Sequence, residues 1–179
     1  MCTLCRRGRS FLGPAFLQVC LMSFVPSSVS AEGWSRVAIH EPLARAAVHS
    51  SLNGTVRWWA QARCQQVLTE FRDEQGCPLA GKLAAMSVTF EGYLEWVLIQ
   101  DSSGTRKCDN PNLYAFTAPG SRVVFVCGKA FERLARKEPE RAIAVLIHEV
   151  LHTLGLGENG IHPTSRDITR RVLELCGRQ

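Results

Sequence analysis

The stretch EPERAIAVLIHEVLHTLGLGE, residues 138–158, decides how this chain is organised. Pro139 stands in the first turn of the predicted helix, where its missing N–H is not needed, and the carboxylates on both sides of it suit the positive end of a helix. Apolar residues then cover nearly all sides of the stretch as far as Leu154, and Gly155 and Gly157 follow as a stop signal. The sequence therefore predicts a helix that is buried on most of its surface.

Three polar residues interrupt this apolar helix: His148, Glu149 and His152. Residues four apart share one helix face, so the two imidazoles can bind one tetrahedral cation. Glu149 lies one residue further round, where it can reach a water beside the cation without binding the cation. A chain of this composition would contain H-E-x-x-H by chance about once in a hundred, and buried polar groups need partners. The pattern predicts two metal ligands and a general base.

Outward from this helix, the sequence predicts an α+β fold in which a small mixed or antiparallel sheet packs against the helix and flanking helices. Apolar residues that recur at helical spacing indicate the helices, and short runs in which apolar and polar residues alternate indicate the strands. The other predicted helices span residues 42–51, 53–71, 131–137 and 166–175. The predicted strands span residues 84–90, 93–100, 114–117 and 122–127, with turns at 91–92 and 118–121.

Residues 1–31 have the pattern of an export signal. Basic residues come first, an apolar stretch of about 15 residues from Phe11 to Val25 follows, and Val29-Ser30-Ala31 offers small residues for cleavage. A membrane span needs roughly 20 apolar residues, so the stretch is short for an anchor. We therefore expect an exported protein, secreted or periplasmic, with residues 32–179 as a single domain and no stable membrane span.

The charge balance of that expected mature chain is mild. The whole sequence carries a net charge of +5, and removal of the signal leaves 18 basic and 16 acidic residues. This argues against nucleic acid as a partner. Arg170, Arg171 and Arg178 predict a solvated basic face, and we expect a monomer.

Five cysteines remain after the signal: Cys64, Cys77, Cys108, Cys127 and Cys176. They can oxidise in an exported protein, and the absence of a C-x-x-C pair argues against a zinc knuckle or a thioredoxin-like site. Sequence spacing does not determine connectivity. The pairing we expect is Cys127 with Cys176 and Cys64 with Cys108, which leaves Cys77 free.

The run HEVLHTLGLGE, residues 148–158, resembles the zincin metallopeptidases, and most of all the metzincin-like pattern H-E-x-x-H-x-x-G-x-x-H/D/E. The resemblance implies that Gly155 allows a sharp turn after the helix and that Glu158 returns as the third ligand to Zn²⁺. Two departures stand out. The third ligand would be a carboxylate in place of the usual histidine, and no methionine turn follows, since Met86 precedes the motif. The resemblance therefore implies a minimal or divergent zincin.

A zincin of this kind would be a peptidase acting on peptide or protein substrates. A metal-activated water would attack the peptide bond, with Glu149 taking and returning the proton. The strand 122–127 would be an edge strand that pairs with an extended substrate, as the resemblance implies. Tyr93, Tyr114 or a backbone N–H could assist at the developing oxyanion.

Several alternatives stay open at the level of sequence. His162 could replace Glu158 as third ligand, whereas Asp167 and Glu174 have less suitable spacings. If His162 closed the site as a fourth ligand, the protein would be a non-catalytic, zinc-stabilised binding module, because closed four-ligand sites are structural. A secreted interaction protein without metal is the remaining possibility.

Overall fold

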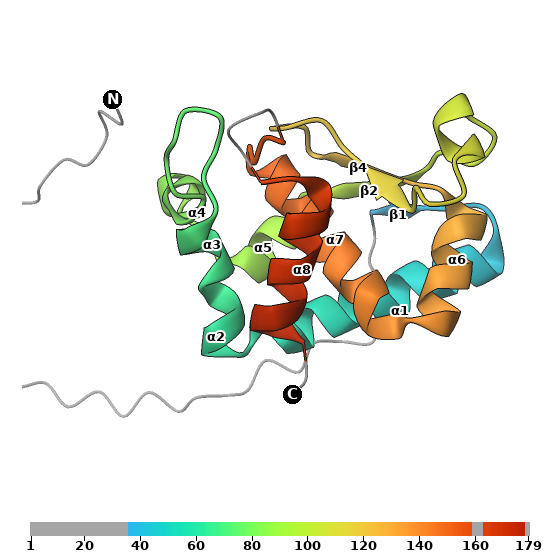
Figure 1. Cartoon of the computed structure of the whole chain (residues 1–179), viewed down its shortest axis with the longest axis horizontal. Coiled ribbons are helices and arrows are strands. Elements are labelled where there is room, and N and C mark those ends of the chain that lie inside the picture. The colour runs from blue at the N-terminus through green and yellow to red at the C-terminus, as the bar shows by residue number, and fades with distance from the viewer. Residues whose placement is uncertain (1–35, 159–162, 178–179) are drawn as a thin grey trace, which may run out of the picture.

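The structure is a computed structural model that describes residues 36–158 and 163–177 (Figure 1). The predicted export signal, His162 and Arg178 lie outside the described residues. Within them the fold is α+β, as predicted, with a small mixed sheet against a set of helices. None of the described helices is both long enough and apolar enough to cross a membrane.

The helices of the described chain are α1 (Pro42–Trp59), α2 (Ala62–Gln65), α3 (Val67–Glu70), α4 (Ala80–Met86), α5 (Phe90–Leu94), α6 (Gly128–Lys137), α7 (Pro139–Thr153) and α8 (Ser165–Cys176), with a 3₁₀ turn η1 (Arg106–Asp109). The strands are β1 (Val37–Ala38), β2 (Leu98–Asp101), β3 (Ala115–Phe116) and β4 (Val123–Val126).

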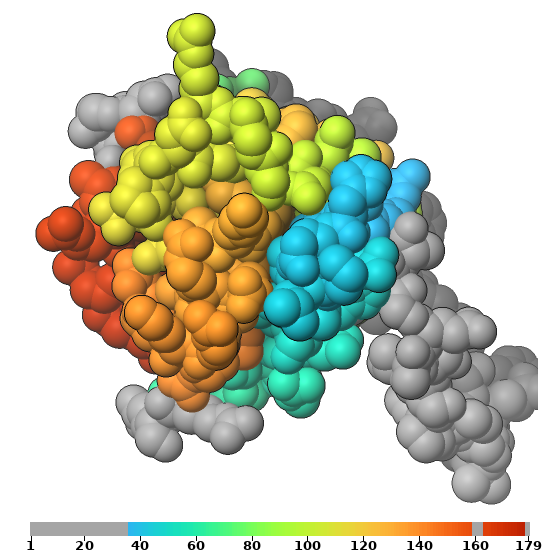
Figure 2. Space-filling view, turned by 90° about the vertical axis from the view of Figure 1, so that its right-hand side faces the viewer, coloured from blue at the N-terminus to red at the C-terminus, as the bar shows by residue number. Residues whose placement is uncertain are grey.

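Helix α7 is the predicted buried helix and lies at the centre of the molecule. Pro139 occupies its first turn, and its apolar residues from Ala142 to Leu151 are buried on nearly all sides. Helices α1, α6 and α8 all pack against it (Figure 1). The side view in Figure 2 shows α1 and α6 next to each other on the surface. These neighbours give α7 a rigid setting, which matters for the residues in its second half.

Helix α1 is continuous from Pro42 to Trp59, and the separate helices α2 and α3 follow it, so the predicted division into helices 42–51 and 53–71 is wrong. Gly54 is buried inside the helix, where it meets the side chain of Ile143 on α7. A Cβ on Gly54 would lie 2.4 Å from Cδ1 of Ile143, which is far inside van der Waals contact. The glycine therefore allows a close approach of two helices and does not end one.

The sheet has the order β1-β2-β4-β3, in which β3 is the only antiparallel member among the described strands. The predicted strands 114–117 and 122–127 form the β3–β4 hairpin, closed by a 2.9 Å bond from the Ser121 N–H to the Ala118 carbonyl. Because β4 pairs with β2 on one side and β3 on the other, it cannot accept a substrate strand. That expectation was wrong: β3 ends the sheet on this side.

The predicted hairpin over residues 84–100 is also wrong. Residues 84–86 end α4, residues 90–94 form α5, and only residues 98–100 belong to a strand, β2. Thr89 caps α5 by accepting a 3.1 Å hydrogen bond from the Gly92 N–H. Phe90, Tyr93 and Leu94 are all buried, and their spacing is that of one helix face. A short apolar run of this kind fits both the period of a helix and that of a strand. Here the Thr89 cap and the burial of one helix face favour the helix.

Two disulfides join described residues, and both differ from the expected pairing. Cys64 on α2 is bonded to Cys176 at the end of α8, and Cys108 in η1 is bonded to Cys127 just before α6. Helix α8 runs across α7 with its end against α2, which carries Cys176 away from Cys127. Cys77 is disulfide-bonded as well, so it is not free. The bridges fit an oxidising, extracellular-type environment.

Candidate metal centre

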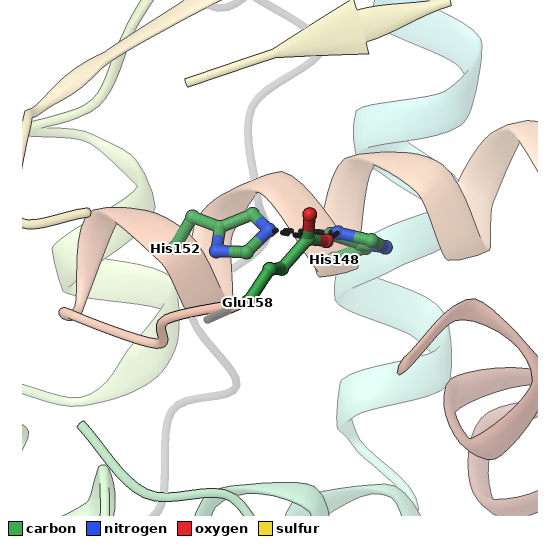
Figure 3. Close-up of side chains that lie close together, drawn as sticks. All are labelled: His148, His152 and Glu158. Atoms are coloured by element: carbon green, nitrogen blue, oxygen red, sulfur yellow. Dashed lines mark hydrogen bonds and ion pairs between the residues drawn. The ribbon is translucent and has the colours of Figure 1, made fainter. Parts of the chain in front are cut away.

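His148 and His152 project from the same face of α7 toward one point (Figure 3). Their Nε2 atoms lie 2.8 Å apart. Oε1 of Glu158 lies 3.1 Å from Nε2 of His148 and 3.2 Å from Nε2 of His152. The three residues that the sequence singled out as ligands are thus brought together, in a group that could hold a metal ion.

Glu158 reaches the histidines because the chain turns back directly after α7. Gly155 has a φ of +104°, a conformation that side-chain-bearing residues rarely adopt, and its N–H bonds to the His152 carbonyl at 2.8 Å. Leu156 is fully buried and forms an isolated β-bridge with Asp73. The turn predicted at Gly155 and Gly157 is therefore held by a core residue, Leu156, and this fixes the position of the Glu158 carboxylate that follows.

Both imidazole rings are oriented through their second nitrogen. Nδ1 of His152 lies 2.7 Å from the Leu156 carbonyl, which can only accept a hydrogen bond. Nδ1 of His152 therefore carries the proton in the neutral ring, and its Nε2 presents a lone pair. Nδ1 of His148 lies 2.8 Å from Oγ1 of Thr169 on α8. Partners of this kind commonly fix the orientation of metal-binding histidines.

Thr169 was not among the residues that the sequence analysis selected. It stands in the middle of an amphipathic helix, twenty-one residues after His148, and only the crossing of α8 over α7 brings the two together. The sequence shows Thr169 only as a threonine on the inner side of a predicted helix. Many residues with a purely packing role have the same position, so the sequence does not mark Thr169 as a partner of His148.

The electrostatics of the group favour a bound cation. Burial lowers the pKa of His148, and the neighbouring His152 lowers it further against the opposing effect of Glu158. The hydrogen bond from His148 lowers the pKa of Glu158, although partial burial opposes this, so this carboxylate stays ionised. Two imidazole nitrogens and one negative oxygen converge on one point, where a cation could take the place of the proton that His148 shares with Glu158. The residues therefore fit a divalent metal ion.

Glu149 lies beside this group and is buried, with 6% of its surface exposed. Its Oε2 has no hydrogen-bond partner in the described part of the chain, and the Thr117 backbone N–H bonds to its carboxylate. Burial, together with the negative charge of Glu158, raises the pKa of Glu149 to about 8 against the opposing effect of the Thr117 N–H. A buried carboxyl with one unused oxygen is equipped to take up and release a proton near neutral pH.

A cleft of about 450 Å³ opens next to Glu149 and His148. Its walls are α7, α8 and the segment 112–115 that leads into β3. Its volume lies within the usual range of ligand pockets. Glu149 and one of the three residues that could hold a metal ion therefore face a space that a ligand can enter.

Two of the alternative ligands, Asp167 and Glu174, do not lie in this group, and His162 is outside the described residues. Asp167 belongs to the capping box of α8 and accepts a 2.7 Å hydrogen bond from the hydroxyl of the N-cap residue Thr164, and Glu174 pairs with Arg171 at 3.0 Å. The hydroxyl of Tyr93 is buried against Thr153, at 3.0 Å from Oγ1, so it has a structural role at the end of α7. Tyr114, the other suggested oxyanion partner, lines the cleft.

Comparison of the chain with protein-family models, with curated proteins and with solved structures gave no match. The class of this protein therefore has to be argued from the geometry of His148, His152, Glu158 and Glu149.

Proposed function

We propose that this chain is an exported, zinc-dependent peptidase, a divergent zincin in which His148, His152 and Glu158 bind the metal and Glu149 is the general base. One observation carries the proposal: three metal-binding atoms converge from α7 and the turn after it, and the buried Glu149 with its unpaired Oε2 faces the adjoining cleft together with His148.

Zinc is the metal that this donor set suits best. Two imidazole nitrogens and one carboxylate oxygen are a known catalytic zinc set, and three protein donors leave a further position open. Zinc–ligand bonds of about 2.0–2.1 Å in a tetrahedral arrangement separate the donor atoms by about 3.3–3.4 Å. Two of the three separations, 3.1 and 3.2 Å from Glu158 to the histidines, are close to that value, and the third, 2.8 Å between the two Nε2 atoms, is shorter.

When bound, zinc would supply a Lewis acid that polarises a peptide carbonyl and acidifies water. The chain's own residues supply the rest. Oε2 of Glu149 takes a proton from the attacking water and passes it to the leaving amine, while the Thr117 N–H holds the carboxylate in place. The positive charge of a metal would favour the carboxylate form of Glu149 and so oppose the effect of its burial.

The substrate would lie along the edge of the sheet. Segment 112–115 lines the cleft and leads into β3, which ends the sheet on this side. An extended peptide can pair with such an edge through backbone hydrogen bonds. This replaces the role that the sequence analysis gave to strand 122–127.

The test compares the wild-type protein with Glu149→Gln, both loaded with zinc. We expect the wild type to cleave a mixture of fluorogenic peptides and Glu149→Gln to lose at least about 100-fold in rate, because general acid–base catalysis typically contributes that much. Both should retain about one zinc per chain, since Glu149 is not a ligand. Glu140→Gln is the matched control, because Glu140 is exposed in the first turn of the same helix.

Two results would reject the proposal. A wild-type zinc content far below one per chain would remove the metal centre. A Glu149→Gln variant as active as Glu140→Gln would remove the general base. Stoichiometric zinc with no cleavage of any peptide would instead favour the zinc-stabilised binding module.

A further inference from the structure

The cleft beside the metal centre is lined by basic side chains. Arg141 on α7 and Arg166 and Arg170 on α8 contribute to its walls. Among the described residues, Glu149 is the only acidic residue that lines it. Three guanidinium groups outnumber this single carboxyl in the lining of the cleft. The walls of the cleft are therefore positively charged.

Arg166 is the basic residue that is best placed to bind a ligand. It is exposed in the first turn of α8 and forms no ion pair with any described residue. An unpaired guanidinium has its full set of donors available for a carboxylate, which it can bind through two parallel hydrogen bonds. The positive end of the α8 dipole acts in the same direction.

The other two arginines have partners outside the cleft. Arg170 contacts Asp167 at 2.7 Å, and Arg141 contacts Glu138 at 3.2 Å. Both pairs are solvent-exposed, with the two arginine side chains 63% and 45% exposed, and pairs of this kind are weak and easily exchanged. Neither Asp167 nor Glu138 lines the cleft, so both arginines border it while their acidic partners lie outside.

We propose that this cleft binds a peptide carboxylate next to the bond that is cleaved, with Arg166 as the main contact and Arg170 and Arg141 in support. This inference rests on the proposed peptidase function and defines its substrate class as acidic peptides. The carboxylate can come from an Asp or Glu side chain inside the peptide or from a free C-terminus. Both present the same planar group to a guanidinium.

The experiment uses one short fluorogenic peptide sequence with an amidated C-terminus, in which Asp is moved through every position and Asn replaces it in a parallel series. A third series has no acidic side chain and carries a free C-terminus. For each peptide we would measure kcat/KM with the zinc-loaded wild type. We would also measure Kd for zinc-loaded Glu149→Gln by fluorescence anisotropy, which does not depend on turnover.

We expect Asp to exceed Asn by about tenfold in kcat/KM at one position, or a free C-terminus to exceed an amide by that factor, as charge-assisted hydrogen bonds are strong. Arg166→Ala should remove most of this preference, and Arg166→Lys should retain part of it. Arg133→Ala is the charge-matched control, since Arg133 is exposed on α6 and away from the cleft. The preference should also decrease at high salt.

The results separate this inference from the proposed function. If peptides are cleaved but the Asp, Asn and free C-terminus series agree within about twofold, the carboxylate preference is wrong and the peptidase function stands. If Arg166→Ala keeps the preference, the assignment of Arg166 is wrong. If no peptide is cleaved, the Kd values decide: an Arg166-dependent preference for a carboxylate supports the cleft, and its absence overturns the inference.

Discussion

Replacing Thr169 by valine tests whether helix α8 orients the metal-binding ring of His148. Valine has nearly the same shape as threonine but no hydroxyl, so it removes the 2.8 Å contact with Nδ1 of His148 and leaves the packing of α8 on α7 intact. The corresponding contact of His152 goes to the backbone carbonyl of Leu156, which no side-chain substitution can remove. Of the two partners that the described residues offer to the Nδ1 atoms, Thr169 is thus the one that a side-chain substitution can delete.

The expected loss of zinc affinity in Thr169→Val follows from the role of the hydrogen bond that is removed. Without it the His148 ring is free to rotate away from Nε2 of His152 and Oε1 of Glu158, and its Nδ1 is left unpaired in a buried place. Loss of such an outer partner typically weakens metal binding by about 10–100-fold, which corresponds to about 1.4–2.7 kcal/mol. The free energy of unfolding of the metal-free protein should fall by less, about 1 kcal/mol.

The assay is competition for zinc with a chromophoric chelator, carried out on the wild type, Thr169→Val and the control Thr69→Val. Thr69 is exposed, and its hydroxyl bonds only to the Gln66 carbonyl one turn earlier. We expect the control to bind zinc like the wild type. If Thr169→Val also binds within about twofold of the wild type while remaining folded, α8 does not position His148 and the reasoning is refuted.

Three further predictions concern stability. Gly54→Val should lower the free energy of unfolding by about 1–3 kcal/mol in a urea titration. Adding Ile143→Ala to the same chain should recover part of this loss, and no recovery would contradict the close contact of α1 with α7. Replacing Cys64 and Cys176 by alanine should cost about 2–5 kcal/mol, since the bridge closes a loop across 112 positions; an unchanged urea midpoint would argue against the bridge. Burial alone would raise the pKa of Asp73, but the ion pair with a lysine and two backbone N–H bonds outweigh it, so the folded-state pKa lies below the ordinary 3.8. The stability advantage of the wild type over Asp73→Asn should therefore be complete above about pH 5 and disappear as the pH falls through that lowered value; a constant advantage would disprove the linkage.

Local patterns predicted the elements that carry the candidate site. The buried helix α7 could be recognised from its own residues because apolar spacing, Pro139 at the start and glycine at the end all belong to one contiguous stretch. The spacing of His148 and His152 follows from helix geometry alone. The turn at Gly155 is likewise a local property, since it depends on one positive φ.

The incorrect predictions concern features that depend on distant contacts or on ambiguous patterns. Residues 84–94 fit both a strand and a helix, and burial of one helix face against the core selected α4 and α5. The disulfide partners of Cys64 and Cys127 depend on where α8 and η1 lie, which spacing along the chain does not specify. The edge of the sheet depends on strand order, which is equally non-local.

By itself, therefore, the sequence determined a buried helix with two imidazoles and a carboxyl in its second half, and a glycine turn placed to bring Glu158 back toward them. Only the tertiary structure decided that Thr169 holds one of those rings, that α8 and segment 112–115 enclose a cleft, and that Arg166 lines it. The physical reason is that helix periodicity and turn conformation are set by neighbouring residues. The meeting of side chains from different elements, in contrast, is set by how the whole core packs.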